Sequence, residues 1–237
     1  MSNPYFQFKQ FTVWHDKCAM KVGTDGVLLG AWTSVQGASR ILDVGTGTGL
    51  VALMLAQRSL RESQIVALEI DEAAVAQAKE NIFHSPWKDR IEVLQKDFIF
   101  FHSSDKFDVI VSNPPYFIDS LICPDQQRNV ARHNDSLTYE ELLKGVVGLL
   151  AKEGRFTIVI PTDVADRVKL LAMNYGMYAV RQLNVVTKPG GISKRTLICF
   201  SLKKQECLTE VLIIELSRHQ YSEEYINLTR EYYLNLK

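Results

Sequence analysis

The stretch RILDVGTGTGL, residues 40–50, decides the fold class of this chain. Its first five residues are typical of a buried β-strand, and the apolar segment that follows at 50–57 is typical of a helix. Glycines between a strand and a helix permit a tight turn and let backbone amides at the helix N-terminus approach a ligand. The stretch therefore predicts the first strand–turn–helix unit of an α/β sheet, with a ligand held at Gly45, Gly47 and Gly49.

Short apolar segments alternate with helical periodicity along the rest of the chain. Strands are predicted at 64–70, 91–95, 107–112 and 154–160, and helices at 72–83, 138–150 and 162–176, the last with Thr162 as its N-cap. An antiparallel pair at 178–186 and 195–202 follows, and the chain ends with a strand at 209–216 and a helix at 222–236.

This alternation predicts an α/β fold with a doubly wound, mostly parallel sheet and an antiparallel closing strand. The 237 residues are enough for one such domain, and no linker divides them. We expect an N-terminal extension (1–38) that covers the site, a core (39–205), and a C-terminal strand and helix (206–237).

Composition narrows the class of protein further. A hydrophobic content of 46% and a charged content of 23% are typical of globular proteins, and no apolar leader or membrane-length run occurs. Four cysteines lack CxxC spacing, which favours reduced thiols and no metal: Cys18, Cys123, Cys199 and Cys207. We expect a cytoplasmic protein.

The net charge is zero, but the charges are unevenly distributed. Between residues 167 and 205 there are eight basic side chains and no acidic one. Such a stretch predicts a local positive face on a neutral protein.

An acidic residue at the end of the second strand extends the ligand prediction. Glu69 lies twenty residues after Gly49, where a carboxylate can accept hydrogen bonds from both hydroxyls of a ribose. A dinucleotide fingerprint has the spacing GxGxxG, whereas here the third glycine is Gly49 and Leu50 follows it. The alternative is that the glycines serve the turn alone.

The segment DVGTGTG (43–49) resembles motif I of the class I S-adenosylmethionine-dependent methyltransferases. This resemblance implies a Rossmann-like fold and S-adenosyl-L-methionine as cofactor. It places Asp43 near the methionine amino group and Glu69 at the ribose. It also places Asp97 at the adenine amino group, with Phe98 beside the adenine ring.

A second motif, DVIVSNPPY (108–116), ends the fourth strand abruptly. In methyltransferases of this shape that position faces the transferred methyl group, so the resemblance implies that Asn113 also borders the cofactor. The Asn113 oxygen and the Pro114 carbonyl can accept the two N–H groups of a planar amine, while Pro115 keeps the turn rigid. Tyr116 offers a stacking face. The motif predicts methylation of a base amine or a glutamine amide, and the alternative is loop punctuation.

The segment HDKCAMKVGTDGVLLGAW (15–32) resembles the N-terminal signature of bacterial tRNA (adenine-N6)-methyltransferases that act on a valine tRNA. Their target is the adenine 3′ of the anticodon, tRNA position 37. The resemblance continues at 131–142, 194–200 and 221–234. It places Thr24 over the cofactor, although Thr24 could also cap a helix.

Other acceptors stay open. Ribosomal guanine-N2 methyltransferases suit the same motif, although they more often resemble a duplicated chain. Two other classes are disfavoured by architecture. Release-factor glutamine methyltransferases resemble this chain only after a helical domain that forty residues cannot supply, and DNA adenine methyltransferases usually carry a separate target-recognition domain, for which we expect no stretch here. A non-catalytic scaffold that binds cofactor or RNA is the remaining alternative.

A tRNA partner requires phosphate contacts. The expected contacts come from the segment 15–32, the segment after Tyr116, and the loop 188–194 with the residue that follows it: Lys21, Arg132, His133, Lys188, Lys194 and Arg195. The target base would flip outwards into the Tyr116 pocket. The sequence is silent on oligomeric state, and a monomer is the simplest expectation.

Overall fold

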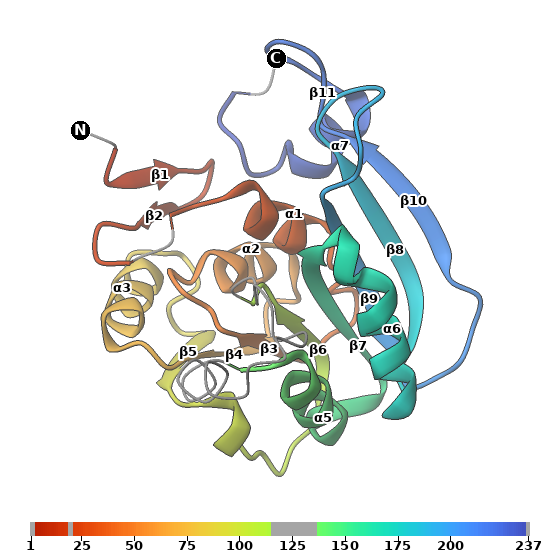
Figure 1. Ribbon diagram of the computed structural model, residues 1–237. Coiled ribbons are helices and arrows are strands. Elements are labelled where there is room, and N and C mark those ends of the chain that lie inside the picture. Colours follow the sequence, from red (N-terminus) through yellow and green to blue (C-terminus); the bar gives the residue numbers. More distant parts are fainter. Residues whose placement is uncertain (1–2, 19–20, 115–136, 236–237) are drawn as a thin grey trace, which may run out of the picture.

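The computed structural model describes residues 3–18, 21–114 and 137–235, and its centre is an eight-stranded sheet (Figure 1). The strand order is β10-β8-β9-β7-β6-β3-β4-β5. Of the described strands in this sheet, β9 alone runs antiparallel to its neighbours. The predicted mostly parallel sheet with an antiparallel closing strand is therefore confirmed. The strands are β3 (Arg40–Val44), β4 (Gln64–Glu69), β5 (Ile91–Gln95), β6 (Phe107–Ser112), β7 (Leu150–Pro161), β8 (Tyr178–Val186), β9 (Arg195–Ser201) and β10 (Leu208–Ile213).

Helices cover both faces of the sheet, which explains why its strands are almost continuously apolar. Successive side chains of a strand point to opposite faces, so Ile41 packs into one core and Leu42 into the other. The first core lies under α1 (Thr24–Trp32), α2 (Leu50–Arg58), α3 (Glu72–Phe83) and α7 (Glu223–Thr229). The second lies under α5 (Tyr139–Leu149), α6 (Ala165–Asn174) and the short helix η1 (Phe98–Phe100).

Two predicted helix caps are wrong. Thr24 is the first residue of α1, and Gly23 occupies the cap position without a side-chain hydrogen bond. Thr162 begins the short helix η2 (Thr162–Val164), and its hydroxyl lies 3.0 Å from the hydroxyls of Ser193 and Thr196. The Thr162 side chain therefore ties the end of β7 to the start of β9, a tertiary role that competes with capping.

The two chain ends depart most from prediction. The final strand ends at Ile213, and β11 (Glu215–Ser217) pairs instead with β12 (Gln220–Tyr221). Helix α7 is much shorter than the predicted segment 222–236.

Tertiary contacts explain why α7 ends early. The N-terminal hairpin of β1 (Tyr5–Gln7) and β2 (Thr12–Trp14) meets the tail, where Phe8 bridges Tyr233 and the Lys9 amide donates to the Tyr232 carbonyl. The Tyr232 side chain is 1% exposed, and its hydroxyl donates to the Met54 carbonyl of α2. These contacts pull the chain out of helical geometry after Thr229 and join both termini on one face of the domain.

None of the helices in the described ranges combines the length and apolar character that a bilayer crossing needs. The same ranges contain no cluster of three or more His, Cys, Asp or Glu side chains that could hold a metal ion.

Candidate active site

The glycine loop after β3 is an open cradle. Gly45, Gly47 and Gly49 have φ values of 72°, 56° and 82°, in the left-handed region that favours glycine. A Cβ added at Gly45 or Gly47 would have no described atom within 4 Å. The described residues therefore leave open the space that faces Gly45 and Gly47, and a side chain at either position would project into this space.

Glu69, at the end of β4, is fixed beside this loop. Its Oε2 accepts a hydrogen bond from the Gly47 amide at 2.8 Å. Its Oε1 accepts from the amides of Ile70 and Asp71 at 2.8 and 3.1 Å. The structure thus brings Glu69 and the glycine loop together. A carboxylate has about four acceptor sites, so one remains for a ligand hydroxyl.

Asp43 is buried beneath the loop, with 1% of its surface exposed. Its Oδ2 accepts from the Thr46 hydroxyl at 2.6 Å, and it also forms a backbone hydrogen bond with Ala52 of α2. Burial raises the pKa of Asp43 to about 7, although both hydrogen bonds oppose that shift. The carboxyl group therefore ties β3 to the loop and to α2, and it titrates near neutral pH.

Asn113 and Pro114 follow β6 directly and lie beside the glycine loop. The Ser112 hydroxyl donates to the Val44 carbonyl at 2.9 Å, which joins the end of β6 to the end of β3. Asn113 is half-buried and Pro114 is buried. A Cβ on Gly26 would lie 3.8 Å from the Asn113 Nδ2 atom, so the first turn of α1 passes directly against Asn113.

Four predicted site residues lie outside the described part of the chain: Pro115, Tyr116, Arg132 and His133.

Asp97 and Phe98 follow β5. The Asp97 Oδ1 atom accepts from the Ile99 amide at 2.9 Å and starts η1. Phe98 is 6% exposed, and a Cβ on Gly145 of α5 would lie 2.5 Å from its ring. Phe98 is thus packed against α5 as a core residue, and its contact with an adenine ring stays a prediction.

The basic stretch is less positive than its sequence predicts. Arg195 donates through Nε to Asp25 of α1 at 2.9 Å, and the Lys188 ammonium lies 3.9 Å from Glu215. Lys169, Arg181 and Lys203 also form ion pairs, with Asp166, Glu210 and Glu153. Five of the eight cations are therefore paired with carboxylates from outside the stretch. Lys194 is exposed just before β9, and Lys21 is exposed just before α1.

Two buried amides on α3 were not identified from the sequence. Asn81 is 1% exposed, donates to the carbonyls of Trp14 and Thr48 at 2.9 and 2.8 Å, and accepts from the Trp14 amide at 2.8 Å. The Gln77 Oε1 atom accepts from the Lys17 amide at 3.0 Å. They anchor the N-terminal segment and the glycine loop to α3. Amides on the apolar face of a predicted helix are the signal that could have revealed them.

Comparisons with known proteins agree with this geometry. The family model "Methyltransferase small domain" matches residues 22–185. A Bacteroides thetaiotaomicron protein named tRNA1(Val) (adenine(37)-N6)-methyltransferase is 76% identical over 237 residues, which cover 100% of each chain. A Phocaeicola vulgatus protein of the same name is 55% identical over 236 residues, again covering 100% of each. Among solved structures, a predicted O-methyltransferase from Agrobacterium tumefaciens has a TM-score of 0.68 over 88% of this chain and 96% of its own, at 17% identity, and so shares the fold.

Proposed function

The chain belongs to the tRNA1(Val) (adenine(37)-N6)-methyltransferase family, and from this premise we propose that it methylates N6 of adenine 37 in a valine tRNA. S-adenosyl-L-methionine is the proposed methyl donor. We further propose that the protein acts as a monomer in the cytoplasm, where its tRNA substrate is found.

The glycine cradle and the acids around it suit this donor. The open space before Gly45 and Gly47 gives room for the ligand, and the remaining acceptor site of Glu69 is proposed to accept from a ribose hydroxyl. We assign Asp43 to the methionine amino group and Asp97 to the adenine amine. Phe98, Thr24 and Gly49 complete the proposed cofactor site.

When bound, the donor supplies a methyl carbon whose bond to sulfur breaks as N6 attacks, with the bonding electron pair left on sulfur. The protein has to aim the poorly nucleophilic N6 lone pair. We propose that the Asn113 Oδ1 atom and the Pro114 carbonyl accept the two N–H groups of the amine, which directs the lone pair towards the methyl group. One of these protons leaves to water after the nitrogen has become cationic, so no strong base is needed.

The single observation that carries this assignment is the position of Asn113. The Ser112–Val44 hydrogen bond holds the end of β6 beside the end of β3, and Gly26 lies directly over the Asn113 amide. A planar acceptor and a ligand in the glycine cradle would therefore meet at Asn113. Tyr116 is expected to stack on the acceptor base, and Pro115 is expected to stiffen the turn. The proposed RNA contacts are Lys21, Lys188, Lys194, Arg195, Arg132 and His133.

Isotope-labelled S-adenosylmethionine and unmodified total tRNA provide the test. We expect label in N6-methyladenosine when the nucleosides are analysed by mass spectrometry. Asn113→Ala should remove this label, whereas Asn174→Ala, at an exposed position in α6, should retain it. Label in N2-methylguanosine would contradict the proposed acceptor, and label confined to protein would contradict the tRNA substrate.

A further inference from the structure

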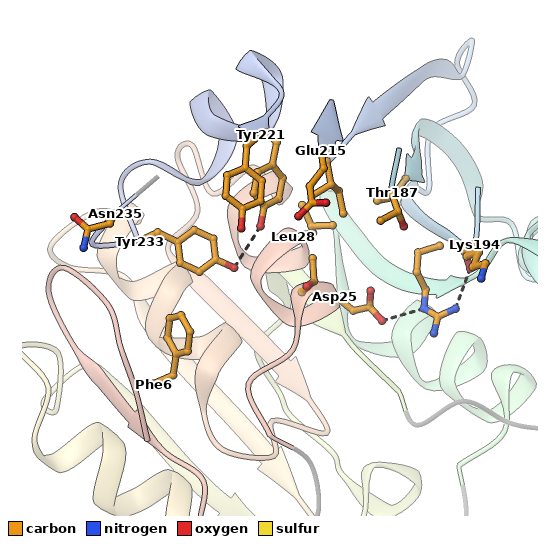
Figure 2. Close-up of a pocket in the computed structure, with 14 residues that line it drawn as sticks. Phe6, Asp25, Leu28, Thr187, Lys194, Glu215, Tyr221, Tyr233 and Asn235 are labelled. Carbon is orange, nitrogen blue, oxygen red and sulfur yellow. Dashed lines mark hydrogen bonds and ion pairs between the residues drawn. The ribbon is translucent and has the colours of Figure 1, made fainter. Parts of the chain in front are cut away.

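A cavity of about 630 Å³ opens beside the first turn of α1 (Figure 2). Thr24 and Asp25 line this cavity, and the next residue, Gly26, lies against Asn113. The cavity and the proposed methyl-transfer site are therefore neighbours, separated by one turn of helix.

Aromatic side chains from both chain ends form one wall of the cavity. The ring centroids of Tyr221 and Tyr225 are 5.2 Å apart, and those of Phe6 and Tyr233 are 5.8 Å apart. Tyr225 is 4% exposed, so it supports the wall from behind. Phe6 is 36% exposed and Tyr233 is half-buried, so both present ring surface to the cavity.

Polar groups converge on the same space. The hydroxyl oxygens of Tyr225 and Tyr233 are 3.4 Å apart, and the side chains of Tyr221, Tyr233 and Glu215 point towards one another (Figure 2). Burial raises the pKa of the Tyr233 hydroxyl, which keeps it a neutral donor and acceptor. Hydroxyl and carboxylate groups beside flat rings suit a ligand that both stacks and forms hydrogen bonds.

The opposite wall is cationic at its rim. The Arg195–Asp25 ion pair joins the start of β9 to α1 across 170 residues of sequence, and Lys194 lines the cavity beside it. An exposed ammonium at the mouth of an aromatic cavity is suited to a phosphate attached to a stacked base.

We propose that this cavity binds one unpaired nucleotide of the tRNA anticodon loop, next to the adenine that reaches Asn113. The proposal rests on the proposed function. The volume of the cavity lies within the range of roughly 300–1,000 Å³ that is typical of small-molecule sites, which is enough for a base and its sugar. Because Thr24 and Asp25 line the cavity and the next residue, Gly26, lies against Asn113, the nucleotide beside the one at Asn113 is the proposed occupant.

This assignment also gives a role to three segments that lie outside the glycine loop. The segments 15–32, 194–200 and 221–234, on which the family resemblance depends, each contribute to the cavity. They supply Asp25, Arg195 and Tyr233, respectively.

The test uses methylation of valine tRNA by the full-length protein at saturating S-adenosylmethionine. Tyr233→Leu should raise KM for tRNA about tenfold, the effect of losing one stacking ring, with kcat and the Kd for S-adenosylmethionine nearly unchanged. Tyr233→Phe should have a smaller effect because it keeps the ring. Tyr175→Leu, at a tyrosine on the opposite face that bonds to Glu140, is the matched control.

Because Tyr233 also packs against Phe8, a second variant guards against misfolding. Lys194→Gln changes an exposed side chain and should also raise KM for tRNA. In addition, an abasic site beside the target adenine should raise KM for the wild type but add little in Tyr233→Leu, because both changes remove the same contact.

Three results would overturn the proposal. An unchanged KM in both the Tyr233→Leu and Lys194→Gln variants, while the wild type methylates tRNA, would leave the proposed function intact and remove the cavity from recognition. If these variants lost affinity for S-adenosylmethionine as strongly as for tRNA, the cavity would be assigned to the cofactor. Failure of the wild type to methylate any tRNA would contradict the proposed function itself.

Discussion

The two sides of the first turn of α1 are built in different ways. On one side, the glycine loop, Glu69 and Asn113 lie at the ends of adjacent strands and depend on backbone geometry. On the other side, the cavity is assembled from side chains such as Phe6, Arg195 and Tyr233, which are far apart in sequence. Chemistry that needs fixed atoms is thus placed on the sheet, while the surface proposed to select the RNA is formed where the chain ends meet.

The largest expected effect is that of Asn113→Ala on the sheet side. Loss of one group that orients the amine should lower kcat on the order of 100-fold, while the Kd for S-adenosylmethionine and KM for tRNA change little. Steady-state kinetics combined with calorimetry separates these quantities. A strong loss of cofactor affinity in Asn113→Ala would contradict this prediction, because it would show that Asn113 holds the cofactor as well as the acceptor amine.

Asn81→Ala should affect both sides, because Asn81 joins the N-terminal hairpin to the glycine loop. Leaving its buried partners unsatisfied should lower the free energy of unfolding by about 2 kcal/mol, measured in urea. The Kd for S-adenosylmethionine and KM for tRNA should rise together. Unchanged stability, with Asn174→Ala as the reference, would show that Asn81 does not couple the two regions.

Gly47→Ala tests the cofactor side of the comparison, with Gly37→Ala as its control. Both Gly47 and Gly37 have positive φ, 56° and 71°, and open space at the Cβ position, but Gly37 lies at the opposite end of β3. Each alanine should cost about 1 kcal/mol of stability. The Kd for S-adenosylmethionine should rise about tenfold in Gly47→Ala alone. Equal affinities in the two variants would argue against a ligand at the glycine loop.

A dependence of stability on pH is also expected to arise beneath the loop. Burial raises the pKa of Asp43 from 3.8 to about 7 in the folded protein, so the folded state binds this proton more tightly than the unfolded state. The contribution of this proton to the free energy of unfolding is fully present below pH 4 and is lost as the pH rises towards 7.

Asp43→Asn cannot titrate. The free energy of unfolding of the wild type, relative to that of Asp43→Asn, should therefore decrease between pH 5 and pH 8. Urea titrations across this range provide the measurement, and parallel pH profiles for the two proteins would contradict a buried, titrating carboxyl group.

The same contrast explains what could be predicted from the sequence. The strand at 107–112 follows from local spacing and is confirmed. Local spacing also indicates Glu69 as a site residue, and its Oε2 atom lies 2.8 Å from the Gly47 amide, while its contact with a ribose stays a prediction. The cavity could not be predicted, because its walls depend on how the two termini meet.

Distant partners also account for the features that local sequence does not predict. Arg195 lies in a stretch without acids, yet Asp25 is its partner across the fold. Thr162 bonds to β9 instead of capping a helix, and α7 ends early because Tyr232 is buried against α2. Each depends on a residue that no local pattern identifies.

The most direct test of the account compares two transcripts of valine tRNA, with adenine or guanine at position 37, in the presence of labelled S-adenosylmethionine. We predict one labelled methyl group per adenine transcript, recovered as N6-methyladenosine, and none in the guanine transcript. Label in N2-methylguanosine, or no label in either transcript while the protein binds S-adenosylmethionine, would contradict the account.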